Sequence, residues 1–279
     1  MKTLASPQVM QRQSRRWLRE GRRVVLVPTM GALHEGHLSL IRRARKRAGE
    51  EGLVVVSIYV NPTQFNDPKD LKAYPRTLKA DQQLCRTEGV NAVFAPETLY
   101  PEGASVEISE NELALSLEGE HRPGHFVGVM TVVAKLFHLV QPTEAVFGEK
   151  DFQQLELIRR MNDDLGFGID VIGVDTVRDA DGLALSSRNS YLSDEQREDA
   201  RAIPQALAAG QAAASAGPDA VVTAAQRVLD DAGIAIDYLD VRGNDCESLT
   251  SPGAARLFVA CLVGTTRLID NCAVELGSV

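Results

Sequence analysis

The sequence has few cysteines, few aromatic residues and no long apolar segment. Its four cysteines, Cys85, Cys246, Cys261 and Cys272, lie far apart without a C-x-x-C pair, which argues against a cysteine zinc site or a dithiol redox motif. No run of about 18 apolar residues is present, so we expect no membrane partner. The first 20 residues carry four arginines in a helical pattern rather than a secretory signal. We therefore expect a cytoplasmic protein.

Positive charge is also in short supply. The chain has 30 Lys and Arg residues against 38 Asp and Glu residues, for a net charge of -8, which disfavours nucleic acid as a partner. No G-x-x-x-x-G-K-[ST] phosphate loop occurs, and no glycine-rich dinucleotide fingerprint follows any expected strand. Kinase and dehydrogenase functions thereby lose their main support.

What the sequence does contain is a repeated alternation of short β-branched runs and helical segments. Of its 279 residues 44% are hydrophobic, enough for a sizeable core. The repeated β-α-β pattern predicts an α/β fold with a Rossmann-like, doubly wound parallel sheet over residues 1–178. Expected strands are 24–27, 53–60, 91–95, 145–147 and 169–174, and expected helices are 7–20, 37–48, 77–88, 130–140 and 152–163.

The pattern changes after about residue 178, and we expect a smaller α+β domain over residues 179–279. Ser193 and Gln196 have the spacing of a capping box, which predicts the start of a helix. An alanine-rich helical stretch is broken near Gly217 and Pro218 and resumes to about Asp231. Three runs, 234–241, 256–263 and 267–271, predict a small antiparallel sheet.

The strongest local signal is the sequence P-T-M-G-A-L-H-E-G-H, which ends the first buried strand and opens a helix. At such a strand-to-helix turn, free backbone N–H groups and the helix dipole attract an anion. The imidazoles of His34 and His37 are three residues apart and are expected to donate hydrogen bonds to a phosphate. A metal site or a pair of surface histidines is the alternative, but Gly36 disrupts the helical H-E-x-x-H arrangement of zinc proteases. His138, inside an apolar helix, is expected to be packed, and His121 and His125 flank a Pro-Gly loop.

Two further segments carry groups suited to phosphate. Gly148-Glu149-Lys150-Asp151 follows a strand and offers a cation beside a glycine, although such a turn is also ordinary surface structure. Ser186-Ser187-Arg188 places two hydroxyls before a guanidinium, as in an oxyanion clamp, although a serine-rich loop between domains has the same composition.

A fourth segment, V-N-P-T-Q-F, follows the second strand. Its neutral amides suit an uncharged, hydroxyl-bearing substrate, whereas the structural alternative is an Asx-type turn before a helix.

Together with Y-P-R-T at 74–77 and R-P-G-H-F at 122–126, these segments closely resemble the pantothenate synthetase (pantoate-β-alanine ligase) family over essentially the whole chain. The resemblance implies a cytoplasmic homodimer whose larger domain belongs to the His-x-Gly-His nucleotidyltransferase group, with the C-terminal domain closing as a lid. It implies that ATP, accompanied by Mg²⁺, and pantoate form pantoyl adenylate, which β-alanine then converts to pantothenate and AMP. No tightly bound cofactor is implied.

The resemblance also assigns roles to residues. His37 corresponds to the residue usually regarded as the proton donor and His34 to its phosphate-binding neighbour, and Lys150 and Arg188 complete the expected catalytic set. Gln64, Gln154, Asn61 and Arg122 are expected to hold pantoate, with Gln64 also near β-alanine. The expected ATP contacts are Met30, Gly31, His34, Gly36, His37, Gly148, Glu149, Lys150, Asp151, Val177, Leu185, Ser186, Ser187 and Arg188.

Two other functions share part of this chemistry. A nucleotidylyltransferase of the same superfamily would stop after pyrophosphate release and would need more basic residues in place of Gln64 and Gln154. A non-catalytic adenine-nucleotide sensor would not need the full set of phosphate-handling side chains.

Overall fold

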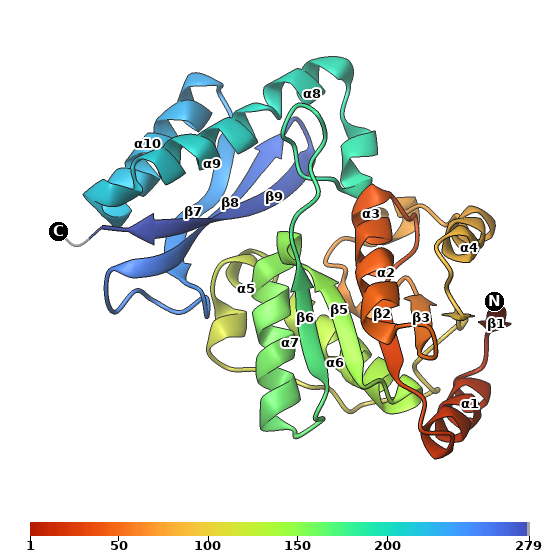
Figure 1. Cartoon of the computed structure of the whole chain (residues 1–279). Helices are drawn as coiled ribbons and strands as arrows, with labels where there is room; N and C mark the ends of the chain where they lie inside the picture. Colours follow the sequence, from red (N-terminus) through yellow and green to blue (C-terminus); the bar gives the residue numbers. More distant parts are fainter. Residues whose placement is uncertain (278–279) are drawn as a thin grey trace. The chain divides into compact units, whose positions relative to one another are not determined.

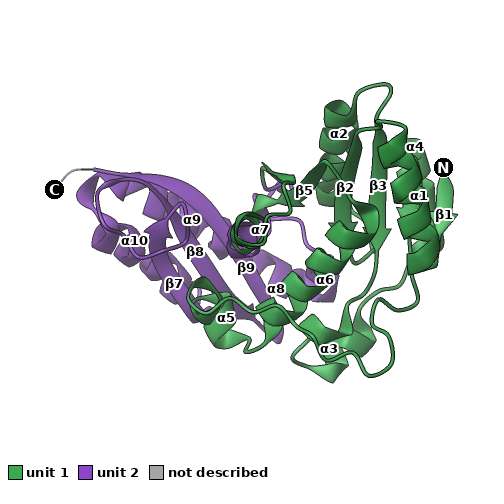
Figure 2. Cartoon of the chain, turned by 90° about the horizontal axis from the view of Figure 1, so that it is seen from below, with its two compact units in different colours: residues 1–149, 157–175 green, residues 150–156, 176–279 purple. Residues whose placement is uncertain are grey.

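The structure, a computed structural model, describes residues 1–277 (Figure 1). By their contacts these residues divide into two compact units, coloured separately in Figure 2. Unit 1 comprises residues 1–149 and 157–175, and unit 2 comprises residues 150–156 and those from 176 onward. The division falls inside helix α7 (Phe152–Asp164), so that its first turn belongs with the C-terminal residues.

Unit 1 is built on a six-stranded sheet in the order β1-β4-β3-β2-β5-β6, with every neighbouring pair parallel. The predicted α/β fold is confirmed. Its strands are β1 (Lys2–Leu4), β2 (Val24–Thr29), β3 (Leu53–Ile58), β4 (Ala92–Phe94), β5 (Glu144–Gly148) and β6 (Asp170–Val174). Its other helices are α1 (Pro7–Arg19), α2 (Glu35–Ala48), α3 (Pro68–Ala73), α4 (Leu78–Thr87), α5 (Glu118–His121) and α6 (His125–Val140), with 3₁₀ turns η1 (Pro62–Gln64) and η2 (Leu113–Leu115). The 3₁₀ turn η3 (Glu149–Asp151) begins in unit 1 and ends in unit 2.

Strands β2 and β3 are apolar on both faces because helices cover both. On one face, Ile41 and Ala44 of α2 pack with Val25 and Val54. Helix α6 contacts β2 and α1, and its apolar residues are almost all buried. A parallel sheet covered in this way needs continuous hydrophobic strands, which is what the sequence supplies.

The strand order reverses beside β2, because the chain runs outward through β3 and β4 and then returns to β5. In parallel sheets, ligands bind at the carboxyl ends of the strands near such a reversal. The register places Thr29 of β2 beside Ile58 of β3, and Leu26 beside Ala145 of β5. The segments that follow these three strands therefore leave one edge of the sheet side by side.

Unit 2 contains a three-stranded antiparallel sheet, β7 (Ala235–Gly243), β8 (Gly253–Val263) and β9 (Thr266–Leu276), in that order. Side chains of α9 (Ala202–Ala212) and α10 (Pro218–Asp231) form one core with this sheet. The predicted capping box is confirmed at α8 (Asp194–Asp199), where Ser193 and Gln196 exchange hydrogen bonds. The 3₁₀ turns η4 (Ser187–Tyr191) and η5 (Ala214–Ala216) complete the unit.

Several unit 1 elements differ from expectation, among them the short helices α3 and α5, which were not predicted. The edge strand β1 was not predicted, because three residues are too short for a pattern and only pairing with β4 defines them. Helix α6 begins at His125 rather than Met130. Gly128 weakens the helical signal there, yet it is required, since a Cβ atom at this position would lie 2.5 Å from the carbonyl oxygen of Thr63.

Both units contain cysteine residues. All four cysteines are free, and all except Cys272 are buried. Burial raises the pKa of Cys85 and Cys261 to about 12 and that of Cys272 to about 11. Among residues 1–277, no helix has the length and apolar character to cross a membrane.

The turn between β2 and α2 has left-handed backbone at two successive residues, Gly31 (φ 84°) and Ala32 (φ 51°). The carboxylate of Asp81, on α4, accepts the N–H groups of Ala32 at 3.1 Å and Leu33 at 2.9 Å. It also accepts the hydroxyl of Thr77 at 3.1 Å and is 1% exposed. Alanine rarely adopts a left-handed conformation, so the turn needs contacts that offset its cost. The hydrogen bonds to the buried carboxylate of Asp81 provide them.

We expect Asp81→Asn to lower the free energy of unfolding by about 2 to 3 kcal/mol, because an amide NH₂ group would then face a backbone N–H. Urea denaturation measures the change. The matched control is Asp164→Asn, an exposed aspartate of unit 1, which should shift stability by less than about 0.5 kcal/mol. Equal effects of the two substitutions would contradict the role given to Asp81.

Candidate functional site

The two histidines of the expected site lie together at the start of α2. His34 is the N-cap of the helix and His37 is its third residue, with ring centroids 4.1 Å apart and ring planes inclined by 48°. The backbone N–H of His34 donates to Nδ1 of His37 at 3.3 Å. Since Nδ1 accepts this bond, a neutral His37 carries its proton on Nε2. The fold thus presents His37 as a hydrogen-bond donor through Nε2.

Most backbone donors of the preceding turn are already engaged within unit 1. Gly31 donates to the hydroxyl of Thr29, Ala32 and Leu33 donate to Asp81, and His34 donates to His37. The expectation that the turn offers free N–H groups is wrong for these four residues. An anion at this position would therefore be met by the imidazoles and the first turn of α2, where the helix dipole is favourable.

Gln64, in η1 after β3, is oriented by Asn61. Nδ2 of Asn61 donates to Oε1 of Gln64 at 3.0 Å and to the carbonyl of Gly128 at 3.1 Å. Oδ1 of Asn61 accepts the hydroxyls of Thr63 at 3.1 Å and Tyr100 at 3.0 Å. With both donors and both acceptor positions occupied, Asn61 is saturated. Because Oε1 of Gln64 accepts a hydrogen bond from Asn61, Gln64 is oriented to interact with a ligand through its NH₂ group, as a donor.

Tyr100 is a member of this cluster that sequence reasoning missed. Its hydroxyl lies 3.2 Å from that of Thr63 as well as bonding Asn61. Burial raises the pKa of Tyr100, so the hydroxyl remains a donor at neutral pH. Tyr100 is 39 residues from Asn61 in sequence, and only the fold brings them together.

The backbone of Gln64 is held from α5 and α6. Its carbonyl oxygen accepts a hydrogen bond from Nη2 of Arg122, with a distance of 3.3 Å, and lies 2.8 Å from Nδ1 of His125. Arg122 also pairs with Glu118 at 3.3 Å, and both carboxylate and imidazole are largely buried. His125 is thus structural, while His121 and His138 are exposed. The expectation that His138 is packed is wrong.

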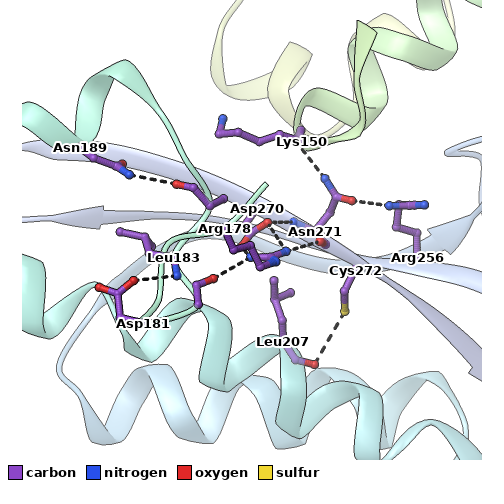
Figure 3. Close-up of polar contacts among 12 residues, drawn as sticks. Lys150, Arg178, Asp181, Leu183, Asn189, Leu207, Arg256, Asp270, Asn271 and Cys272 are labelled. Carbon is purple, nitrogen blue, oxygen red and sulfur yellow. Dashed lines mark hydrogen bonds and ion pairs between the residues drawn. The ribbon is translucent and has the colours of Figure 1, made fainter. Parts of the chain in front are cut away.

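Unit 2 carries the expected cations. Lys150 lies in η3, with Nζ 3.6 Å from a carboxylate oxygen of Asp151, and Gln154 is half-buried on α7. Ser186 caps η4 by accepting the N–H of Arg188 at 3.2 Å. The chain before it folds back on itself, because Leu185 donates to Val177 and Asp179 donates to the carbonyl of Leu183. Figure 3 shows part of this region beside β9.

The expected residues are therefore divided between the units. Unit 1 holds Met30, Gly31, His34, Gly36, His37, Asn61, Gln64, Arg122, Gly148 and Glu149, and unit 2 holds Lys150, Asp151, Gln154, Val177, Leu185, Ser186, Ser187 and Arg188. In unit 1 the histidine turn follows β2, the Asn61–Gln64 segment follows the adjacent strand β3, and Gly148 is the last residue of β5, on the other side of β2. Within residues 1–277, no three His, Cys, Asp or Glu side chains are grouped as a metal site would require.

Known proteins resemble this chain over most of its length. The family model described as pantoate-beta-alanine ligase matches residues 2–273. Pantothenate synthetase from Mycolicibacterium smegmatis is 52% identical over 92% of this chain and 82% of its own length, and that from Nocardia farcinica is 53% identical over 92% and 81%.

Solved structures show the same relationship. Pantothenate synthetase from Thermus thermophilus has a TM-score of 0.91 and 43% identity, with both chains fully covered. Pantoate-beta-alanine ligase from Francisella tularensis, complexed with beta-gamma ATP and beta-alanine, has a TM-score of 0.81 and 34% identity over 98% of this chain and 97% of that one. From sequence and fold alike, the chain belongs to the pantoate-beta-alanine ligase family.

Proposed function

We propose that this chain condenses pantoate with β-alanine in two ATP-dependent steps. In the first, a carboxylate oxygen of pantoate attacks the α-phosphorus of ATP, and the bond to pyrophosphate breaks. In the second, the amine of β-alanine attacks the acyl carbon of pantoyl adenylate, AMP leaves, and the nitrogen loses a proton to give pantothenate. The main support in the structure is the placement of an imidazole pair and an oriented carboxamide after adjacent strands of unit 1.

The histidines act on the α-phosphate in this proposal. Negative charge grows on its non-bridging oxygens during attack, and preorganised donors stabilise that charge. Nε2–H of His37 is such a donor, with its tautomer fixed by the backbone N–H of His34. His37 thus contributes chiefly by donating a hydrogen bond, with His34 as the second imidazole of the pair.

Gln64 binds pantoate through its amide NH₂, which suits a carboxylate or hydroxyl oxygen. Asn61 has no hydrogen-bonding capacity left for substrate, so we assign to it the role of orienting Gln64. Arg122 supports the Gln64 carbonyl in the same way. Gln154 remains a proposed pantoate contact.

Unit 2 supplies the cations for the leaving pyrophosphate. Lys150 and Arg188 offset its charge, and the hydroxyls of Ser186 and Ser187 add neutral donors. Mg²⁺ enters with ATP as part of that substrate. Further ATP contacts are assigned to Met30, Gly31, Gly36, Gly148, Glu149, Asp151, Val177 and Leu185.

The family resemblance supports three further proposals: a homodimer, a cytoplasmic location, and a lid formed by the C-terminal domain. Exclusion of water by a lid would protect the adenylate from hydrolysis. The division into residues 1–178 and 179–279 stays a prediction about these functional domains.

Mass spectrometry of reaction products tests the two-step scheme. ATP and pantoate alone should give pantoyl adenylate and pyrophosphate, and later addition of β-alanine should give pantothenate and AMP. Absence of pyrophosphate release until β-alanine is present would rule out the scheme. Transfer of AMP to a phosphorylated acceptor would identify a nucleotidylyltransferase, and nucleotide binding without turnover would identify a sensor.

His37→Ala should lower kcat by about 10²- to 10³-fold, because it removes a donor to charge that appears in the transition state. The KM for ATP should change much less. His37→Gln should restore part of the activity, since its amide can donate without titrating near neutral pH. The control is His138→Ala, at an exposed histidine of the same unit. Near-normal turnover by folded His37→Ala would remove His37 from the mechanism.

Gln64→Ala should raise the KM for pantoate roughly tenfold, the effect of losing about one hydrogen bond, with little change in the KM for ATP. Gln64→Glu should be at least as harmful, because an acceptor replaces the donor and repels the pantoate carboxylate. Gln83→Ala, at an exposed glutamine, is the control. A change confined to the KM for ATP would place Gln64 in the nucleotide site instead.

A further inference from the structure

The three-stranded sheet of unit 2 has two differently used faces. Leu268 and Val274 belong to the core formed with α9 and α10. Asn271 alternates with these residues along β9, and Phe258 is its partner on β8. Against this second face lies the segment 150–156, which belongs to unit 2 although it follows β5 of unit 1 in sequence.

Asn271 joins this segment to β9, as Figure 3 shows. Its Nδ2 donates to the backbone carbonyl of Lys150 at 2.9 Å, and its Oδ1 accepts Nη1 of Arg256 at 2.6 Å. A guanidinium can only donate, so it fixes which end of the Asn271 amide faces it. The NH₂ end is thereby directed to Lys150, and Asn271 is only 3% exposed.

Arg256 holds the same segment at a second point. Its guanidinium lies 3.6 Å from the ring centroid of Phe152, the residue two positions after Lys150. Phe152 also packs near Phe258, with ring centroids 6.1 Å apart. The start of α7 is thus held on the sheet by a hydrogen bond at Lys150 and by ring contacts at Phe152.

On the opposite face, an ion pair between the half-buried Arg178 and the buried Asp270 fixes the backbone of Asn271. Arg178 bonds both carboxylate oxygens of Asp270, at 2.5 and 3.0 Å, and donates to the carbonyl of Asn271 at 3.3 Å. Asp270, 3% exposed, accepts the N–H of Asn271 at 2.8 Å. Arg178 also donates to the carbonyl of Gly182, in the loop that leads to Ser186.

We propose that Asn271 is a positioning residue that sets the place of Lys150, with Arg178 and Asp270 fixing Asn271 and the loop before Ser186–Arg188. This network would join the two cation-bearing segments of unit 2 into one rigid body. The proposal rests on the proposed function, because it gives Lys150 a role in offsetting the charge of the leaving pyrophosphate. Asn271 itself acts only through Lys150.

A double-mutant cycle tests the coupling. Asn271→Asp keeps the shape and the Arg256 partner but removes the donor to the Lys150 carbonyl. We expect it to lower kcat for adenylate formation about tenfold, the effect of one lost hydrogen bond, with less than a twofold change in the KM for pantoate. In the Lys150→Ala background, the same substitution should change kcat less than twofold, because the two residues act as a unit.

Controls separate positioning from general destabilisation. Arg256→Met, which removes the donor that orients the amide, should show the same non-additivity with Lys150→Ala. Asn271→Asp combined with Gln64→Ala, in the other unit, should instead be additive, and Glu275→Gln at an exposed residue of β9 should be neutral. Thermal unfolding of each variant reports its folding.

Two outcomes would overturn the proposals separately. If folded Asn271→Asp and Arg256→Met lower kcat equally with and without the Lys150 side chain, Asn271 does not act through Lys150. If Lys150→Ala alone leaves kcat unchanged while pantothenate is still formed, the role of Lys150 in the proposed function fails instead.

Discussion

A buried carboxylate on α4 holds the backbone from which both histidines project. Without Asp81, the N–H groups of Ala32 and Leu33 would lack partners and the left-handed Ala32 would have no compensation. The turn determines where α2 begins, and that start determines the tautomer of His37 through the N–H of His34. A residue 44 positions after His37 in sequence thus governs the chemistry proposed for it.

The two units contribute different kinds of donor. Unit 1 offers the imidazoles and the Gln64 amide, and its nearby guanidinium on Arg122 is paired with Glu118. The cations proposed for phosphate, Lys150 and Arg188, belong to unit 2. Donors oriented by a rigid sheet suit the substrate oxygens and the charge that grows on the α-phosphate, whereas the permanent charges of Lys and Arg suit the larger charge of a leaving pyrophosphate.

Much of this arrangement follows from local sequence patterns. Hydrophobic runs and the capping box at Ser193 predicted the sheet and a unit 2 helix, because those signals lie within a few residues of the elements they specify. The saturation of Asn61 by Tyr100, and the bond from Asn271 to Lys150, involve residues far apart in sequence. Periodicity carries no information about such pairs, so the Asn61 amide looked like a substrate contact. For the same reason, the sequence could not predict that residues 150–156 belong to unit 2.

The raised pKa values of the cysteine thiols have a practical consequence for following this chain in solution. With a pKa of about 11 for Cys272 and about 12 for Cys85 and Cys261, fewer than roughly one thiol in a thousand is ionised at neutral pH. Burial raises the pKa of Cys246 as well. Maleimide dyes react with the thiolate, so we expect little labelling of the native cysteines. An exposed cysteine introduced into each unit would accept a donor and an acceptor fluorophore without prior removal of the native thiols.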